Sequence, residues 1–341
     1  MRILIEGVGG VGGIIAARLI AAGFEPVLVT GNPEIAGAIK KNGISAKTPT
    51  EEFNVLAKAV VSLDDLDEQE RFDAAFLIMK ANRVVEAAEK TISLLRGDAG
   101  YVVTFQNGLV EDAVAAAVGA QRVISGIIGW GATMHAPGVY EKTSGGEIHI
   151  GELDGSISER IKKLEAALEV VCPVVISNNI RGALWSKMAI NCMITSMGAL
   201  TGQLLGEMLQ ERRVRRAFLV IYREVLDTAS SAGIKVERIA ANPRLFYLPP
   251  NAGPLNRFIK DVLMKILGRR YRKLKSSMLQ SLERGRPAEI DYLNGYVVET
   301  AKKHGVPVPL NSLVTRMVKE IESGKRKIEK RNMDELLAEM G

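Results

Sequence analysis

The chain has 341 residues, of which 47% are hydrophobic and 25% are charged. This length suits two globular domains, and the apolar content excludes a fold that depends on disulfide staples. The formal net charge of +6 fits an anionic ligand, although a modest basic excess is also common on an ordinary protein surface.

The cysteines and histidines exclude two classes of site. Cys172 and Cys192 are the only cysteines and stand too far apart for a disulfide framework, which favours a reducing cytoplasm. The three histidines show no metal-ligand spacing, so we expect no metal. The first residues do not have the order of a signal peptide, and Arg18 interrupts the early apolar stretch. We therefore expect a cytoplasmic protein.

Strand-like and helix-like stretches alternate over the first half of the chain. Strands are predicted over residues 2–6, 25–30, 72–80 and 173–177. Residues 101–108 are predicted as a strand followed by a turn, residues 122–134 as a strand with a loop, and residues 138–153 as a hairpin. Helical spacing of apolar residues fills most of the intervals between them. This alternation predicts a parallel sheet with helices on both faces.

The pattern changes near residue 180, after which almost every stretch has helical periodicity. We place a domain boundary there. The predicted fold class is α/β, with a Rossmann-type dinucleotide-binding domain over residues 1–178 and an all-helical substrate and catalytic domain over 179–341.

A glycine-rich segment joins the first predicted strand to the first helix. It has the pattern GxGxxG over Gly7, Val8, Gly9, Gly10, Val11 and Gly12. The first glycine permits a tight turn, the second permits close approach of a pyrophosphate, and the third permits close helix packing. The helix N-terminus adds unpaired N–H groups. The strand and helix context favours dinucleotide binding over a simple tight turn.

The choice between NAD and NADP depends on the end of the second strand. NAD enzymes usually carry an acidic residue there, but this chain has Thr30, Gly31 and Asn32. No acid repels a 2′-phosphate, no Arg clamps one, and Lys80 and Arg83 after the strand at 72–80 could add positive charge. We expect NADPH as the cofactor, with NAD as the alternative.

Residues 257–275 are strongly basic, with apolar residues at helical spacing. The simpler interpretation is an amphipathic helix with a solvated basic face. The alternative is docking on a membrane surface or a nucleic acid. We expect neither partner.

Polar residues lie within two otherwise apolar stretches of the second half of the chain. Lys187, Asn191 and Thr195 are spaced four apart and share one helix face. Ser277 and Glu289 lie in the segment SSMLQSLERGRPAEIDYLNG. Polar side chains are costly to bury without partners, so these residues form either a catalytic site or an interhelical hydrogen-bond network.

At these residues the chain resembles the ketopantoate reductase (2-dehydropantoate 2-reductase) family. The resemblance runs from the GxGxxG segment through FQNG to the KMAIN helix and the SSMLQ…EIDYLNG segment. It implies NADPH-dependent reduction of 2-dehydropantoate to pantoate for coenzyme A biosynthesis, with the site between a Rossmann domain and a helical domain.

The resemblance also implies residue roles. Lys187 would be the general acid and Glu289 would lie beside it. The substrate would contact Asn107, Asn191, Thr195 and Ser277, and the cofactor would contact the glycine segment, Lys80, Asn107 and Glu289. The substrate partner would be a small 2-oxo acid. A homodimer stays open, because the sequence carries no interface signal.

The chain departs from the family pattern at several positions. Thr195 stands where the family usually has a second Asn, and Arg83 where it usually has Gln. Glu6, inside the first motif, is also unusual. Thr195 is shorter than Asn and could reshape the pocket. The alternatives are therefore a reductase of the same family for another 2-oxo acid, or a dinucleotide-binding regulator without turnover.

Overall fold

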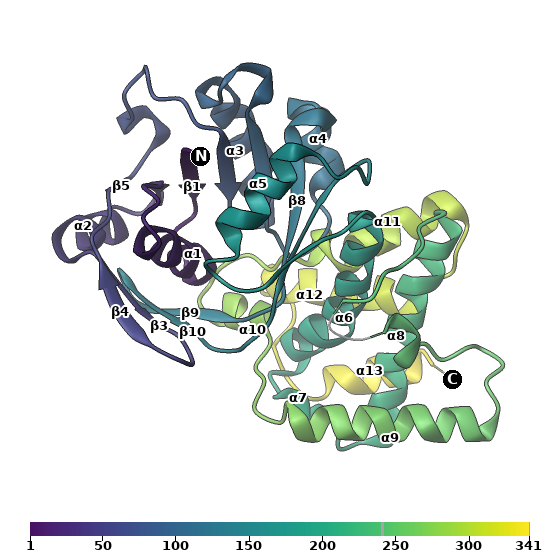
Figure 1. Cartoon of the computed structure of the whole chain (residues 1–341). Helices are drawn as coiled ribbons and strands as arrows, with labels where there is room; N and C mark the ends of the chain where they lie inside the picture. The colour runs from purple at the N-terminus through teal and green to yellow at the C-terminus, as the bar shows by residue number, and fades with distance from the viewer. Residues whose placement is uncertain (240–241, 341) are drawn as a thin grey trace. The chain divides into compact units, whose positions relative to one another are not determined.

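The computed structural model describes residues 1–239 and 242–340, and the chain divides into two compact units (Figure 1). The sheet unit consists of residues 1–106 and 110–180, and the helical unit consists of residues 107–109 and 181–341. The grouping of residues 107–109 with the helical unit was not anticipated from the sequence. The α/β class with a helical second part is confirmed.

The main sheet of the sheet unit has eight strands within residues 1–180, all of which are described. Their spatial order is β12-β11-β8-β7-β6-β1-β2-β5. The strands are β1 (Ile3–Glu6), β2 (Val27–Val29), β5 (Ala59–Val60), β6 (Ala74–Leu77), β7 (Tyr101–Thr104), β8 (Val123–Ile128), β11 (Ile148–Glu152) and β12 (Val174–Ile176).

The order of strands along the chain reverses at β1. β1 pairs in parallel with β2 on one side and with β6 on the other. Its residues, like those of β6, β7 and β8, are buried throughout, which explains the continuous apolar runs in the sequence. Open α/β sheets bind ligands at the carboxyl ends of the strands beside such a reversal, and the glycine segment begins there.

Helices cover both faces of this sheet. α1 (Gly10–Ala21) packs against α5 (Glu159–Leu168), and α3 (Val84–Thr91) packs against α4 (Glu111–Val118). α2 (Pro33–Asn42) begins where the Asn32 side chain accepts a hydrogen bond from the N–H of Glu34 at 2.8 Å. Because such caps satisfy otherwise unpaired N–H groups, they define where a helix starts.

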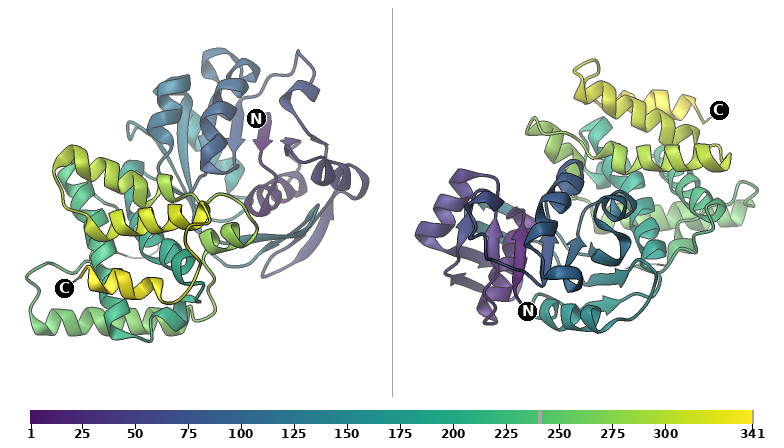
Figure 2. Two further views of the ribbon diagram at one scale, coloured as in Figure 1. Left: turned by 180° about the vertical axis from the view of Figure 1, so that it is seen from behind. Right: turned by 90° about the horizontal axis from the view of Figure 1, so that it is seen from above.

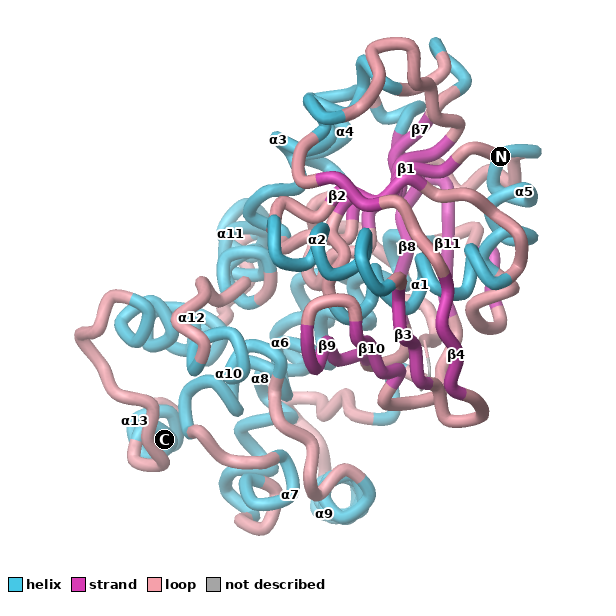
Figure 3. Tube along the Cα trace, turned by 90° about the vertical axis from the view of Figure 1, so that its left-hand side faces the viewer, coloured by secondary structure: helices cyan, strands magenta, loops and turns pink. Residues whose placement is uncertain are grey.

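A second sheet was missed in the sequence. It has the order β4-β3-β10-β9 and consists of β4 (Glu52–Val55), β3 (Ile44–Lys47), β10 (Val139–Lys142) and β9 (Ala132–Ala136). It packs against α1 (Figure 3). The predicted hairpin over 138–153 is therefore wrong: β10 pairs with β9 and β3, whereas β11 joins the main sheet antiparallel to β8.

The helical unit is built around α6 (Ile180–Thr201) and α8 (Arg212–Ser231), seen from two further directions in Figure 2. Its other helices are α7 (Leu205–Met208), α9 (Pro254–Arg270), α10 (Ser277–Glu283), α11 (Asn294–His304), α12 (Pro309–Glu322) and α13 (Asn332–Ala338). α11, α12 and α13 all contact α8.

The apolar face of α8 explains this packing. Phe218, Ile221 and Val225 recur at helical spacing and are fully buried. No helix among the described residues is long and apolar enough to cross a membrane.

Candidate functional site

The glycine segment forms a tight turn between β1 and α1. Gly7 has a φ of +99°, and a Cβ at this position would lie 2.7 Å from the main chain of Ile78. A Cβ at Gly12 would lie 2.0 Å from the carbonyl oxygen of Gly7. Neither position has room for a side chain, whereas Gly9 faces open space with no atom within 4 Å of its Cβ direction. The turn is therefore closed on its inner side and open at Gly9.

The N-terminus of α1 is free of side-chain caps. Gly9 is the N-cap residue and makes no side-chain hydrogen bond to the helix, and the first turn carries no acidic residue. Uncapped N–H groups at a helix N-terminus attract anions such as phosphate. These features fit the pyrophosphate of a dinucleotide.

Glu6 directly precedes the glycine turn and is buried. The Thr91 hydroxyl of α3 donates a hydrogen bond to its carboxylate. Burial raises the pKa of Glu6 to about 7. An ionisable group therefore sits beneath the turn, on the α3 side of the main sheet.

The end of β2 carries one unsatisfied polar atom. The hydroxyl of Thr30 is buried and has no hydrogen-bond partner among the described residues. Buried polar groups usually have partners, so an unpaired hydroxyl next to the glycine turn fits contact with a polar ligand. Main-chain hydrogen bonds tie the strand to the turn, because the N–H of Gly7 donates to Val29 at 2.8 Å.

Lys80 and Arg83 follow β6, on the other side of β1. Lys80 is exposed and precedes the short 3-10 helix Ala81–Arg83, at the end of which Arg83 is also exposed. Both cations are thus accessible beyond the end of β6, a neighbour of β1, where the sequence predicted a cofactor contact at Lys80.

In the helical unit, five of the residues singled out in the sequence line one cavity, together with Met278 and Leu293. They are Asn107, Asn191, Thr195, Ser277 and Glu289. They come from four segments: the 107–109 strip, α6, the start of α10, and the residue before the 3-10 helix Ile290–Tyr292. Polar side chains that are distant in sequence therefore converge on one point.

Residues 107–109 are held in the helical unit by a main-chain contact. The N–H of Leu109 donates to the carbonyl of Tyr292 at 3.2 Å. Tyr292 ends the 3-10 helix that follows Glu289. This bond brings the strip with Asn107 beside the segment with Glu289.

Lys187 lies one helical turn before Asn191 on α6 and is half-buried. It is not among the residues that line the cavity. Residues four apart on a helix lie on the same face, so Lys187 belongs to the face of α6 that contributes Asn191 to the cavity.

The cavity is narrow. Its volume of about 10 Å³ admits no more than about one water molecule. A 2-oxo acid could enter only if lining side chains move.

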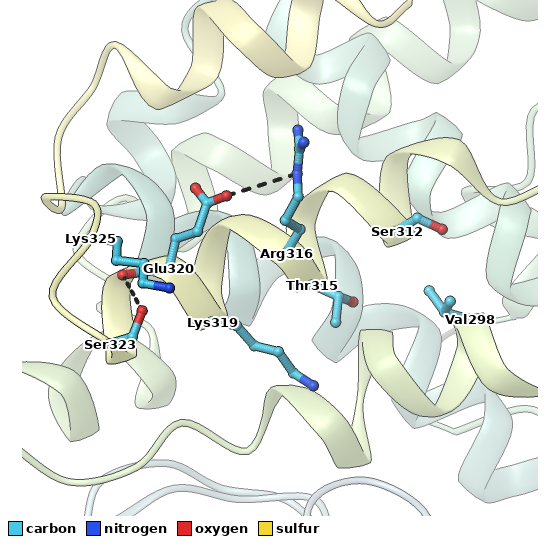
Figure 4. A pocket seen from close by; sticks show the side chains of 8 residues that line it. All are labelled: Val298, Ser312, Thr315, Arg316, Lys319, Glu320, Ser323 and Lys325. Carbon is cyan, nitrogen blue, oxygen red and sulfur yellow. Dashed lines mark hydrogen bonds and ion pairs between the residues drawn. The ribbon is translucent and has the colours of Figure 1, made fainter.

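A larger groove of about 410 Å³ lies along α12 (Figure 4). Most of its charges are already engaged: Arg316 pairs with Glu335 at 3.0 Å, and Lys319 pairs with Asp291 at 2.5 Å. None of the residues singled out in the sequence lines this groove. The smaller cavity is therefore the better candidate site.

A buried polar network behind the cavity was missed in the sequence. The Ser196 hydroxyl, adjacent to Thr195, donates to the Asn294 side chain. Asn294 in turn donates to Asn311 at 2.9 Å, and Asn311 donates to the Glu224 carboxylate at 2.7 Å. This series of hydrogen bonds links α6, α11, α12 and α8. Asn294 lies in the EIDYLNG segment that carries the family resemblance, but nothing in the spacing of that segment distinguishes this Asn.

Glu224 ends the network at the start of α12. Its carboxylate accepts hydrogen bonds from the main-chain N–H groups of Leu310 and Asn311, at 3.1 and 2.9 Å. Burial raises the pKa of Glu224, while these hydrogen bonds oppose the shift. The carboxylate thereby fixes the N-terminal end of α12 against α8.

The largely parallel sheet, its glycine turn and the helical unit define the class of Rossmann-type oxidoreductases with a helical second part. Two family models match the chain: "Ketopantoate reductase PanE/ApbA" over residues 3–155 and "Ketopantoate reductase PanE/ApbA C terminal" over residues 179–322. The chain belongs to the ketopantoate reductase family, and the predicted resemblance is confirmed.

Individual relatives agree over nearly the whole chain. A 2-dehydropantoate 2-reductase of Mesorhizobium japonicum is 27% identical, with 94% of this chain and 98% of the relative covered. A 2-dehydropantoate 2-reductase of Pyrococcus abyssi is 26% identical, with 95% of this chain and 98% of the relative covered. These similarities extend across both units.

Solved structures share the fold. A PanE/ApbA family ketopantoate reductase from Ralstonia eutropha JMP134 gives a TM-score of 0.80 at 24% identity, covering 96% of this chain and all (100%) of that one. A D-mandelate dehydrogenase solved with NADH and anilino(oxo)acetate gives a TM-score of 0.81 at 21% identity. The match covers 95% of this chain and 99% of that one.

Proposed function

We propose that this protein uses NADPH to reduce the ketone of 2-dehydropantoate, forming pantoate for coenzyme A biosynthesis. The observation that carries the proposal is the convergence of Asn107, Asn191, Thr195, Ser277 and Glu289 on one cavity. Family membership gives the reaction class, and the uncapped glycine turn fits the cofactor's pyrophosphate.

The dinucleotide would be held by the glycine segment from Gly7 to Gly12, with Lys80 and the Thr30 hydroxyl as further contacts. Asn107 and Glu289 are the cofactor contacts that the helical unit would add. When bound, the reduced nicotinamide supplies the hydride for the ketone carbon. The absence of an acid at Thr30-Gly31-Asn32 favours NADPH over NADH as the physiological donor.

Lys187 is the proposed general acid. As the ketone is reduced, its oxygen gains negative charge and needs a proton. An ammonium at that oxygen stabilises the charge and donates the proton, and loss of one such donor typically costs about 2.7–4 kcal/mol. Asn191 and Ser277 have the amide and hydroxyl groups suited to the substrate's hydroxyl and carboxylate. Glu289 would orient Lys187.

The first test is turnover of 2-dehydropantoate by the purified protein, followed as loss of NADPH absorbance and, separately, of NADH absorbance. We expect turnover that is faster with NADPH. Replacing Lys187 with Ala should lower kcat by about 10²–10³-fold and leave dinucleotide affinity unchanged. The exposed Lys302 on α11 gives a matched control, since Lys302→Ala should change neither quantity. Full activity of Lys187→Ala would refute its role.

A second candidate substrate class is favoured by Thr195. This side chain lines the cavity where the family pattern has an Asn, so the cavity lacks one amide. A different 2-oxo acid would then be the substrate. Dinucleotide binding without turnover of any 2-oxo acid would instead indicate a regulator.

We propose a cytoplasmic location. Cys172 and Cys192 are both buried and free, which fits a reducing compartment.

A further inference from the structure

The helix α9 presents its apolar side chains to solvent. Leu255, Phe258 and Ile266 are 72%, 60% and 52% exposed, and Ile259 and Val262 are also exposed. At 100° per residue these five positions form one stripe along the helix. A contiguous stripe of this kind is unusual on a protein surface and marks an interaction site.

The opposite face of α9 is anchored to the helical unit. Asp261 receives two hydrogen bonds from the Arg215 guanidinium of α8, at 2.7 and 3.0 Å. Met264 and Gly268 are buried, and a Cβ at Gly268 would lie 2.7 Å from Leu209. Lys260 donates to the carbonyls of Arg244 and Leu245. These contacts fix the rotation of the helix, so the apolar stripe cannot turn inward.

This arrangement corrects part of the sequence interpretation. An amphipathic helix with a solvated basic face was expected, with its apolar residues packed inside. In the structure the apolar residues form the outer face. α9 runs along the edge of the helical unit (Figure 1), and the exposure of its apolar side chains shows that no described element of that unit covers its outer face.

Basic side chains flank the stripe. Lys265 lies on one side of it, Arg270 on the other, and Arg269 continues it towards the C-terminal end; all three are exposed. Exposed Arg272 and Lys273 follow directly. None of these five cations forms an ion pair with a residue that the structure describes. The outer face of α9 is thus apolar along most of its length, with the cations gathered at its C-terminal end.

The charges on α9 favour an anionic lipid surface over a second copy of this chain as the partner that covers its outer face. The acid of α9, Asp261, is already paired with Arg215. A second copy packed through the stripe would bring Arg269 and Arg270 against either the same residues or the apolar first turns of the helix, without an acidic counterpart on the helix. An anionic lipid surface matches both features, since acyl chains accept the stripe while lysine and arginine reach the phosphates.

We propose that α9 is an interfacial docking helix that binds the protein to the surface of an anionic phospholipid bilayer. The stripe inserts at the boundary between headgroups and acyl chains, and the flanking cations contact phospholipid headgroups. The protein lies on the membrane and does not cross it. This proposal is independent of the reaction proposed above.

The test is flotation of the full chain with vesicles of phosphatidylcholine alone and of phosphatidylcholine mixed with phosphatidylserine. We expect binding to the mixed vesicles at low salt, weakened at high salt by screening. Equal binding to both kinds of vesicle, or binding to neither, would overturn the proposal without any variant.

Two variants separate the contributions. Lys265→Gln/Arg269→Gln/Arg270→Gln should reduce partitioning by on the order of tenfold or more. Leu255→Ser/Phe258→Ser/Ile266→Ser should abolish insertion. Lys302→Gln/Lys303→Gln on α11 is the matched control, because both lysines are exposed and remote in sequence from α9; it should bind like the parent.

Light scattering after size-exclusion chromatography measures the oligomeric state and so tests whether a second copy of the chain covers the stripe. A parent chain that is dimeric without vesicles, and that becomes monomeric in the serine variant, would assign the stripe to a second copy and overturn membrane docking. A nucleic acid partner, lost only with the charges and retained in the serine variant, would overturn it as well.

Discussion

The phenol hydroxyl of Tyr140 donates a hydrogen bond to the main-chain carbonyl of Val8, at 3.0 Å. Tyr140 belongs to β10 of the second sheet, and its ring covers Gly13, where a Cβ would lie 2.4 Å from the ring. Burial raises the pKa of Tyr140 to about 12, so the hydroxyl keeps its proton at neutral pH. The second sheet therefore supports the glycine turn from outside the Rossmann core.

Replacing Tyr140 with Phe should loosen this turn. The buried carbonyl of Val8 would lose its donor, which typically costs about 1–3 kcal/mol. We expect lower thermal stability and up to about tenfold weaker dinucleotide affinity, measured by calorimetry. Tyr271→Phe, at an exposed position after α9, is the control. Unchanged affinity in Tyr140→Phe would show that the turn keeps its shape without the bond.

Glu6 should make stability depend on pH. Burial raises its folded-state pKa to about 7, above the ordinary value near 4.5. The folded state therefore binds the proton more tightly, so the contribution to stability is complete below about pH 4.5 and is lost as the pH rises through about 7. The shift corresponds to at most about 3 kcal/mol.

Glu6→Gln should remove this dependence. Relative to the parent, its free energy of unfolding should improve progressively from pH 5 to pH 8, as measured by urea titration at each pH. Glu86→Gln, exposed on α3, should show no such trend. A constant difference between parent and Glu6→Gln across this range would contradict the assignment.

Asn294→Ala should damage the network behind the cavity. It would leave Asn311 and Ser196 without a shared buried partner, at a cost of about 1–3 kcal/mol. Because the two Asn residues are coupled, the double variant Asn294→Ala/Asn311→Ala should lose less stability than the sum of the single variants. Additive losses in denaturant unfolding would mean that the residues act independently.

Thr195→Asn tests the proposal that this cavity binds the substrate and determines which 2-oxo acid is accepted. Restoring the family's amide should raise the kcat/KM for 2-dehydropantoate relative to other 2-oxo acids, by about tenfold or more. Thr195→Val, which keeps the size but removes the hydroxyl, is the matched control. If the ratio between substrates stays constant in Thr195→Asn, this position does not determine specificity.

Local patterns were sufficient to predict most strands of the main sheet, but not β5 or β11. The buried runs of β1, β6, β7 and β8 read as strands because both of their faces are covered, and the helices between them showed clear periodicity. The second sheet could not be predicted in the same way. Its strands are short, and the pairing of β3 with β10 joins segments separated by about ninety residues.

The same distinction between local patterns and distant contacts applies to the candidate site. The motif residues Asn191, Ser277 and Glu289 could be named from the sequence, and they line one cavity. Their supports could not be named, because Tyr140 and Asn311 act through contacts with distant segments. The outward apolar stripe of α9 was also hidden, since periodicity gives a face but not its direction.

The grouping of residues 107–109 with the helical unit has a consequence for chimeric proteins. The chain passes between the units after residues 106, 109 and 180, so it crosses three times. A family chimera joined at residue 180 would take Asn107 from one parent and the rest of the cavity wall from the other. Under the proposed role of this cavity, transferring substrate preference by recombination would require residues 107–109 to come from the same parent as the second half.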